Sequence, residues 1–286
     1  PTHRLNRPNL ASSGCKMMSE QKFKTDIEGA VARLTLINPD KHNAFDDALI
    51  AGLTDAFKDF GDNEAVRVVV LASEGKSFSA GADLNWMKRM AGYSREENLA
   101  DAMALAELMK TINTLNKPVV GLIQGAAFGG GVGLVACCDI ALASDKASFC
   151  LSEVKLGLIP AVISPYVVDA MGAQSARRYF LTAERFDATE AHRLGLVHEV
   201  VPHEALAEKG EALVQQLLSV GPKATAAAKD LVFAVNRPVD TDVIADTAAR
   251  IANIRASEEG RDGPSSFLET RKPSWLEGYI PCSSNP

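Results

Sequence analysis

Hydrophobic positions change their spacing several times along the chain, and each change predicts a different element. Residues 23–28 and 31–37 predict two strands joined at Gly29, which is a hairpin. Residues 44–60 predict a helix, because their large apolar residues fall on one stripe. That stripe consists of Phe45, Leu49, Leu53, Phe57 and Phe60.

Continuous apolar runs then predict strands that are buried on both faces. Residues 67–72, 119–124 and 139–143 are such runs, and residues 196–201 predict a shorter strand. A helix separates the first two runs. Ser94 and Glu97 have the spacing of a capping box at its start, and Pro118 ends it. The alternation of strands and helices predicts an α/β fold with parallel pairing and right-handed crossovers.

Beyond residue 204 the pattern is almost entirely helical. Pro222 and Pro238 interrupt it, and Pro264 is expected near a helix start. We expect residues 1–20 to be a disordered extension or a cloning remnant, residues 21–201 to form the core, and residues 202–286 to form a helical region.

Composition excludes few classes of protein. The chain has 286 residues, 47% of them hydrophobic and 23% charged, as in an ordinary globular protein. Its net charge of −6 argues against a nucleic-acid partner or an anionic membrane surface. No apolar run is long enough to span a bilayer, so no membrane partner is expected.

The cysteines indicate free thiols in a reducing compartment, so we expect a cytoplasmic protein. Their number is odd, and none has metal-ligand spacing, so no metal is expected. They are Cys15, Cys137, Cys138, Cys150 and Cys282.

Two segments rich in small residues follow predicted buried strands. Residues 77–84 (SFSAGADL) let a ligand approach the backbone closely. Residues 125–133 (GAAFGGGVG) open a helix, where outward-pointing amides carry partial positive charge. Negative charge that develops only in a transition state is stabilised at such a place. Simple helix–sheet packing is the alternative role for these glycines.

Two nucleotide-binding readings fit less well. Gly75-Lys76-Ser77 ends a P-loop pattern, but Val70 stands where its first glycine belongs. Residues 131–136 match GxGxxA, but the preceding strand is expected to end near Gln124, which leaves too long a turn.

Taken together, six co-linear motifs resemble the crotonase (enoyl-CoA hydratase/isomerase) superfamily. They are NPDKHNAF (38–45), FSAGADL (78–84), GAAFGGGVGLVACCDIALAS (125–144), SEVKLGLIP (152–160), ERFDATEAHRLGLVHEVV (184–201) and FLETRKPSWLEG (267–278). The resemblance implies a spiral core of repeated ββα units and a C-terminal helical trimerisation region. It also implies a homotrimer or a dimer of trimers.

The resemblance further implies an acyl-CoA substrate and no cofactor beyond its coenzyme A moiety. The amides of Ala82 and Gly130 would form an oxyanion hole for the thioester carbonyl, with Glu153 as the acid/base. The coenzyme A path would be lined by Lys41, Ala44, Ala80, Ala82, Asp83, Leu84 and Phe267. Lys41 as a solvated lysine and Asp83 as a helix N-cap are the structural alternatives.

One departure from the family concerns the second glutamate that its hydratases commonly use. That residue would stand at Gly133, so Glu153 has no carboxylate partner in this sequence. We expect Gly133 to leave space beside Glu153 for a branch on the acyl chain. Trp86 and Met87 are expected to line the acyl pocket, with core packing as the alternative.

The motifs are most similar to those of bacterial hydratases of branched glutaconyl-CoA thioesters. We therefore expect hydration of 3-methylglutaconyl-CoA or isohexenylglutaconyl-CoA, with Lys88, Arg89 or Arg95 meeting the distal carboxylate. An isomerase that shifts the double bond with Glu153 alone is the alternative. A subunit that binds RNA or only assembles with partners fits the acidic chain and the intact Glu153 less well.

Overall fold

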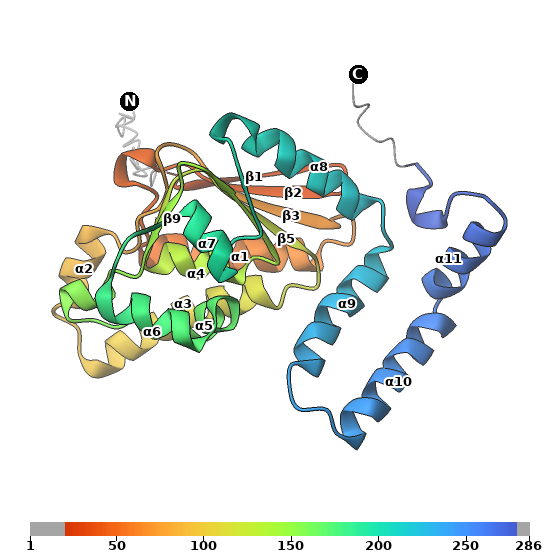
Figure 1. Ribbon diagram of the computed structural model, residues 1–286. Coiled ribbons are helices and arrows are strands. Elements are labelled where there is room, and N and C mark those ends of the chain that lie inside the picture. Colours follow the sequence, from red (N-terminus) through yellow and green to blue (C-terminus); the bar gives the residue numbers. More distant parts are fainter. Residues whose placement is uncertain (1–20, 279–286) are drawn as a thin grey trace, which may run out of the picture.

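The computed structural model describes residues 21–278 and contains two β-sheets that share one core (Figure 1). The larger sheet has the order β1-β2-β3-β5-β7-β10, and the smaller has the order β4-β6-β8-β9. The larger sheet consists of β1 (Phe23–Glu28), β2 (Val31–Leu36), β3 (Val68–Ser73), β5 (Val119–Ile123), β7 (Ile140–Ser144) and β10 (Glu199–Val201). The smaller consists of β4 (Ser77–Ser79), β6 (Ala126–Phe128), β8 (Ser148–Cys150) and β9 (Phe186–Asp187).

Pairing in the larger sheet follows the predicted α/β pattern. β1 and β2 form the antiparallel hairpin, with Gly29 at its turn in the left-handed region (φ 58°). All further neighbours pair in parallel. β3, β5 and β7 each lead into a short strand of the second sheet and then into a helix. This repetition is the ββα spiral that the family resemblance implies.

Alternate residues of β3 explain why its sequence is continuously apolar. Val69 and Leu71 pack into the main core, whereas Val68 and Val70 pack on the opposite side of the sheet with Val214 of α8. The strand is therefore buried on both faces, as the sequence predicted.

The described residues also form α-helices. They are α1 (Asp47–Asp62), α2 (Leu84–Met90), α3 (Arg95–Asn113), α4 (Gly130–Cys137), α5 (Ser164–Met171), α6 (Ala173–Thr182), α7 (Ala188–Leu194), α8 (Leu206–Leu218), α9 (Pro222–Val235), α10 (Thr241–Ala256) and α11 (Glu258–Leu268). α3 begins with the predicted capping box between Ser94 and Glu97. α8 packs on the core sheet, although it follows the predicted boundary at residue 201.

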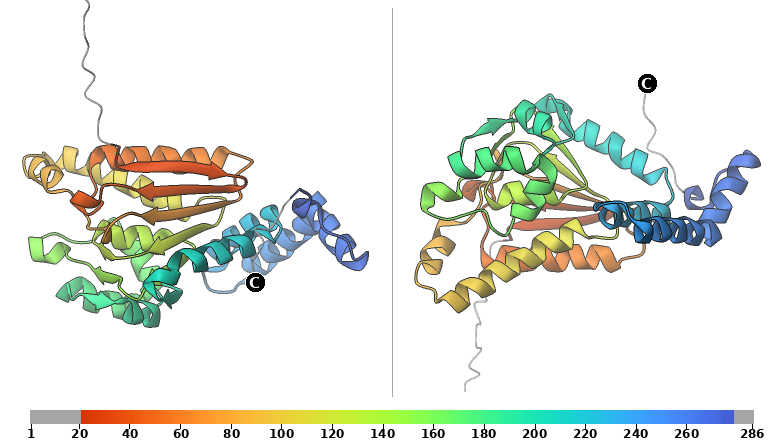
Figure 2. Two further views of the ribbon diagram at one scale, coloured as in Figure 1. Left: turned by 90° about the horizontal axis from the view of Figure 1, so that it is seen from above. Right: turned by 60° about the horizontal axis from the view of Figure 1, so that its bottom comes forward.

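The last three helices, α9 to α11, extend to one side of the core (Figures 1 and 2). Pro264 lies inside α11 rather than near a helix start, so that expectation was wrong. No helix in the described part of the chain is long and apolar enough to cross a bilayer. The predicted extension at residues 1–20 and two cysteines, Cys15 and Cys282, lie outside the described residues.

Candidate functional site

Three strands of the smaller sheet end at one edge, and this edge collects the predicted site. β4 pairs with β6 in parallel, and β6 pairs with β8 in parallel, with Phe128 opposite Cys150. The segments that follow these strands are therefore neighbours. They carry Ala82, Gly130 and Glu153, which lie far apart in the sequence.

Gly81 allows the first two segments to approach closely. Its φ of +87° is unfavourable for any residue with a side chain, and a Cβ there would lie 3.1 Å from the carbonyl oxygen of Phe128. Glycine is thus required by both backbone conformation and space.

The loop before α1 holds the segment that carries Ala82. The amide of Phe45 donates to the Gly81 carbonyl at 2.7 Å, and the amide of Asp83 donates to the Phe45 carbonyl at 2.7 Å. Buried Asn43 fixes the same loop, because its side-chain amide donates to the carbonyls of Glu74 and Ser77 at 2.9 Å. Ala82 is therefore positioned by backbone hydrogen bonds on both of its sides.

The amides of Ala82 and Gly130 have no protein acceptor in the described part of the chain. Gly130 is the first residue of α4, where a backbone N–H has no partner within the helix. The helix dipole adds partial positive charge at this end. The amide of Gly129, by contrast, is engaged with the Cys150 carbonyl at 2.9 Å.

Glu153 stands at the start of a 3-10 helix, η2 (Glu153–Leu156), and its carboxyl group lies against Gly129. A Cβ built on Gly129 would be 3.1 Å from Glu153 Oε1. Its Oε2 is buried and has no hydrogen-bond partner. Burial raises the pKa of Glu153, opposed only by a hydrogen bond from its own backbone N–H. A desolvated carboxyl with one unpaired oxygen, beside Gly129 and the start of α4, has the properties of an acid/base group.

The expected open space beside Gly133 is not observed, so that prediction was wrong. A Cβ at Gly133 would lie 2.3 Å from Cγ2 of Ile163 and 3.3 Å from Cε of Met109. The volume next to this glycine is filled by a side chain thirty residues further along the chain, which local spacing cannot reveal.

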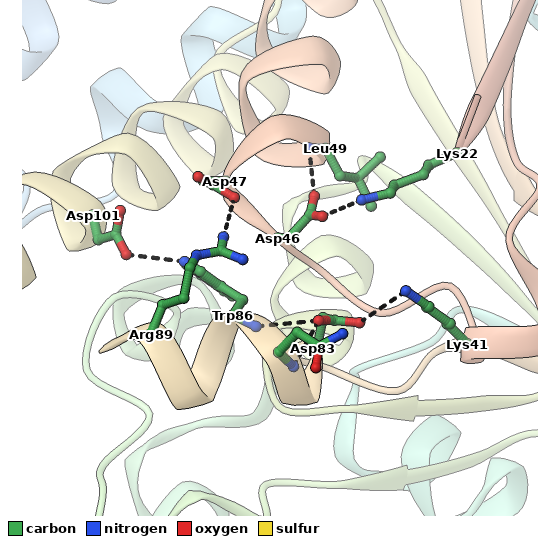
Figure 3. Close-up of polar contacts among 10 residues, drawn as sticks. Lys22, Lys41, Asp46, Asp47, Leu49, Asp83, Trp86, Arg89 and Asp101 are labelled. Carbon is green, nitrogen blue, oxygen red and sulfur yellow. Dashed lines mark hydrogen bonds and ion pairs between the residues drawn. The ribbon is translucent and has the colours of Figure 1, made fainter. Parts of the chain in front are cut away.

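Asp83 and Trp86 have structural contacts at the start of α2 (Figure 3). Asp83 caps the helix by accepting from the amides of Asn85 and Trp86, and its other carboxylate oxygen lies 3.9 Å from Lys41 Nζ. Trp86 is 6% exposed, and its indole N–H donates to Asp101 at 3.0 Å. The core-packing alternative therefore describes Trp86, while Met87 beside it is only partly buried.

The three cationic side chains predicted to bind a carboxylate differ in whether they already form an ion pair. Arg89 forms an ion pair with Asp47 of α1 at 2.6 Å (Figure 3). Lys88 and Arg95 are exposed. Of the three predicted carboxylate-binding groups, Arg89 is therefore already paired with a carboxylate of the protein itself.

The residues expected along the coenzyme A path differ in exposure. Ala44 is buried, Ala80 is partly buried and Lys41 is exposed. Leu84 and Phe267 have 73% and 83% of their surfaces exposed. Phe267 lies on α11, far from the core in Figure 1, and the structure does not bring it to the edge that carries Glu153.

Two further features lie outside this edge. A cavity of about 480 Å³ separates the core from α9, and Asp139, Tyr166 and Lys229 are among its lining residues. The described residues contain no cluster of three or more metal-ligating side chains.

The sequence did not single out Gly129 and Ile163, because their importance lies in contacts with residues far along the chain.

Known proteins share this sequence and architecture. The profile of the enoyl-CoA hydratase/isomerase family matches residues 26–278. An enoyl-CoA hydratase from Shewanella pealeana has a crystal structure that superposes with a TM-score of 0.87 at 47% identity, covering 89% of this chain and 96% of that one. Enoyl-CoA hydratase ACTT6 of Alternaria alternata is 36% identical over 78% of this chain and 76% of its own length.

A third relative carries a different name within the same chemistry. Carnitinyl-CoA dehydratase of Citrobacter koseri is 31% identical over 86% of this chain and 95% of its own length. With the profile match spanning most of the chain, these similarities establish that the protein belongs to the enoyl-CoA hydratase/isomerase family.

Proposed function

We propose that this protein is an enoyl-CoA hydratase that adds water across the 2,3 double bond of a branched acyl-CoA. One observation carries the proposal: the Glu153 carboxyl, whose buried Oε2 has no hydrogen-bond partner, lies against Gly129, directly before the free amide of Gly130. An acid/base group and a donor for developing negative charge are thus adjacent.

In this proposal the amides of Ala82 and Gly130 bind the thioester carbonyl oxygen. Attack of water on C3 moves electrons onto that oxygen, and two preset N–H groups stabilise the resulting enolate. Losing one such donor typically raises the barrier by roughly 3–4 kcal/mol. Their lack of protein acceptors supports the assignment.

Glu153 would act twice in one turnover. Its carboxylate takes a proton from water while the oxygen bonds to C3. The resulting carboxylic acid then donates a proton to C2 of the enolate, which restores the thioester and the carboxylate. The raised pKa of Glu153 suits a group that must both accept and return a proton.

The substrate class in this proposal is a branched glutaconyl thioester, such as 3-methylglutaconyl-CoA or isohexenylglutaconyl-CoA. The resemblance of the motifs supports it, whereas the volume beside Gly133 gives no support, because Ile163 fills it. Lys88 and Arg95 are the candidates for pairing with the distal carboxylate, because Arg89 is already paired with Asp47.

Coenzyme A would follow the path formed by the backbone of Ala44 and Ala80 and the side chains near the start of α2. Lys41 is suited to a phosphate, since it is exposed and its contact with Asp83 is long at 3.9 Å. Asp83 and Leu84 complete this part of the proposed site, and Met87 is proposed to line the acyl pocket. Phe267 would belong to it only through another subunit.

A homotrimer or dimer of trimers fits the apolar surface of the C-terminal helices. Within residues 222–278, the large apolar side chains with at least 45% of their surface exposed are Val232, Phe233, Val239, Ile244, Ile251, Phe267 and Leu268. Assembly would cover these side chains. Sedimentation of the purified chain measures the assembly directly.

A double-bond isomerase on the same site is the second candidate. The single carboxylate favours it, because one glutamate suffices to move a proton between C2 and C4. The relatives named hydratase and dehydratase support hydration instead, since these names describe the two directions of one addition of water.

Incubation with 3-methylglutaconyl-CoA and crotonyl-CoA tests the proposal. Loss of enoyl-thioester absorbance with a product 18 mass units heavier is expected, and Glu153→Gln should lower the rate by roughly 10²- to 10⁴-fold. Glu208→Gln, an exposed glutamate on α8, serves as the control and should keep full activity. Unchanged hydration by Glu153→Gln would refute the assigned base, and a shifted double bond of unchanged mass would identify an isomerase.

A further inference from the structure

Gly133 of α4 and Ile163 before α5 occupy one shared volume. A Cβ on Gly133 would lie 2.3 Å from Cγ2 and 2.9 Å from Cβ of Ile163, both closer than non-bonded carbons approach. Ile163 is only 3% exposed, and the neighbouring Met109 is fully buried. The isoleucine therefore cannot move aside without displacing the core.

This shared volume lies close to Glu153. Gly129, the N-cap of α4, faces the Glu153 carboxyl, and Gly133 lies four residues later. The Gly133 amide lies 3.4 Å from the Gly129 carbonyl oxygen, so the two positions are one helical turn apart. Ile163 therefore approaches α4 about one helical turn beyond the carboxyl.

The charged groups around Glu153 do not account for its raised pKa. Lys155 lies on η2, Cys150 ends β8, and Arg185 precedes β9 and stacks on Phe128 at 4.6 Å. Two further cations, Arg177 and Arg178, lie on α6, which packs against η2. Tyr166, Asp169 and Cys137 are the titratable groups of α5 and α4. Burial is the main cause of the raised pKa of Glu153, and none of these groups contributes to it.

We propose that Ile163 is a positioning residue for Glu153: its side chain fills the volume beside α4, limits the access of bulk water to the carboxyl, and restricts position 133 to glycine. The proposal rests on the proposed function, in which Glu153 is the acid/base. It adds a residue that acts through Glu153 rather than by touching the reacting atoms. The site therefore has one carboxylate and an apolar wall next to it.

The pH profile of kcat/KM tests the shielding role. Ile163→Gly removes the wall, so more bulk water reaches Glu153 and the acid limb of the profile should shift to lower pH. Glycine is tolerated at this position for the helix itself, because Ile163 is the N-cap of α5. Ile163→Val keeps both γ carbons and should leave the limb in place.

Val214→Ala controls for general loss of packing. Val214 is fully buried, but it belongs to the separate cluster between α8 and the sheet. The Val214→Ala variant should lower the melting temperature without moving the acid limb of the pH profile. An acid limb that stays in the same place in folded Ile163→Gly would overturn the proposal. If that variant does not fold, Ile163→Ala provides the same comparison.

A second measurement tests the shared volume. Gly133→Ala alone should lower the melting temperature, since the new methyl group meets Ile163. In combination with Ile163→Gly the loss should be smaller than the sum of the two single losses, whereas Ile163→Val should give no relief. Additive losses in the double variant would contradict the coupling.

A titration without substrate separates this inference from the proposed function. Carbon-13 NMR of labelled glutamate carboxyls, with Glu153→Gln to assign the signal, reports the protonation of Glu153 directly. A lower midpoint in Ile163→Gly supports the shielding role even if no enoyl-CoA is turned over. If the enzyme is active and Glu153 titrates identically in the parent protein and in Ile163→Gly, the proposed function stands and the shielding role of Ile163 is rejected.

Discussion

At the scale of single residues, Glu153 combines burial with a missing hydrogen-bond partner. Its Oε2 is buried without a partner, and its Oε1 lies against a glycine. Folding thus removes water from the carboxyl and supplies little in return, which costs stability when the group is ionised. Such a cost is typical of groups whose position serves chemistry.

Glu153→Gln is therefore expected to stabilise the fold at neutral pH. The folded-state pKa is raised, so between the unfolded and folded values the native protein binds more protons than the unfolded chain. The free energy of unfolding then falls as pH rises through that window. The variant should resist urea better than the parent at pH 7, and the advantage should vanish below about pH 4.

Urea unfolding at the two pH values measures this difference, with Glu208→Gln as the exposed control. Equal stability of Glu153→Gln and the parent protein at both pH values would mean that the carboxyl is not desolvated in the folded state.

At the scale of elements, α3 shows how local sequence starts a helix. The Ser94 hydroxyl accepts from the Glu97 amide at 3.1 Å, and the Glu97 carboxylate accepts from the Ser94 amide at 2.7 Å. Two amides that would otherwise lack partners are satisfied together. These contacts are local, which is why the motif was readable from four residues.

Ser94→Ala should lower the free energy of unfolding by about 1 kcal/mol, because the first turn loses its side-chain acceptor. Ser94→Asn is the matched control and should keep the stability, since asparagine caps equally well. Chemical denaturation of the three proteins measures the effect. An alanine variant as stable as the asparagine variant would show that the cap contributes nothing.

At the scale of the whole molecule, one ion pair ties α9 to the core. Lys229 Nζ lies 2.7 Å from Asp139 and donates to the Lys117 carbonyl at 3.2 Å. Its side chain is 11% exposed. Burial raises the pKa of Asp139, and Lys229 opposes that rise, so the carboxylate depends on this lysine.

Lys229→Met should lower the free energy of unfolding by about 2–3 kcal/mol, somewhat less than for fully buried pairs, because Asp139 retains partial exposure. Lys223→Met is the matched control, an exposed lysine at the start of α9, and should change stability by less than about 0.5 kcal/mol. Thermal and urea unfolding measure both variants. Equal stability of the two would contradict a structural role for the pair.

The sequence alone determined those features whose causes are local. Hairpin, buried strands and capping box follow from side-chain spacing within a few residues, and the larger strands lie within about one residue of their predicted bounds, apart from the last strand. The proposed catalytic segments were assigned by resemblance, because six motifs in order identify a family. The short strands β4, β6 and β8 were missed, since three residues carry no readable period.

Only the tertiary structure decided which side chains lie beside each proposed catalytic segment. The space expected next to Gly133 is filled by Ile163, and Trp86 is held in the core by Asp101. Glu153 meets Gly129 because β6 and β8 end at the same edge of the sheet. Contacts between residues fifteen or more positions apart depend on how strands and helices pack. A linear pattern specifies which surfaces are buried, but it does not specify which side chains share a volume.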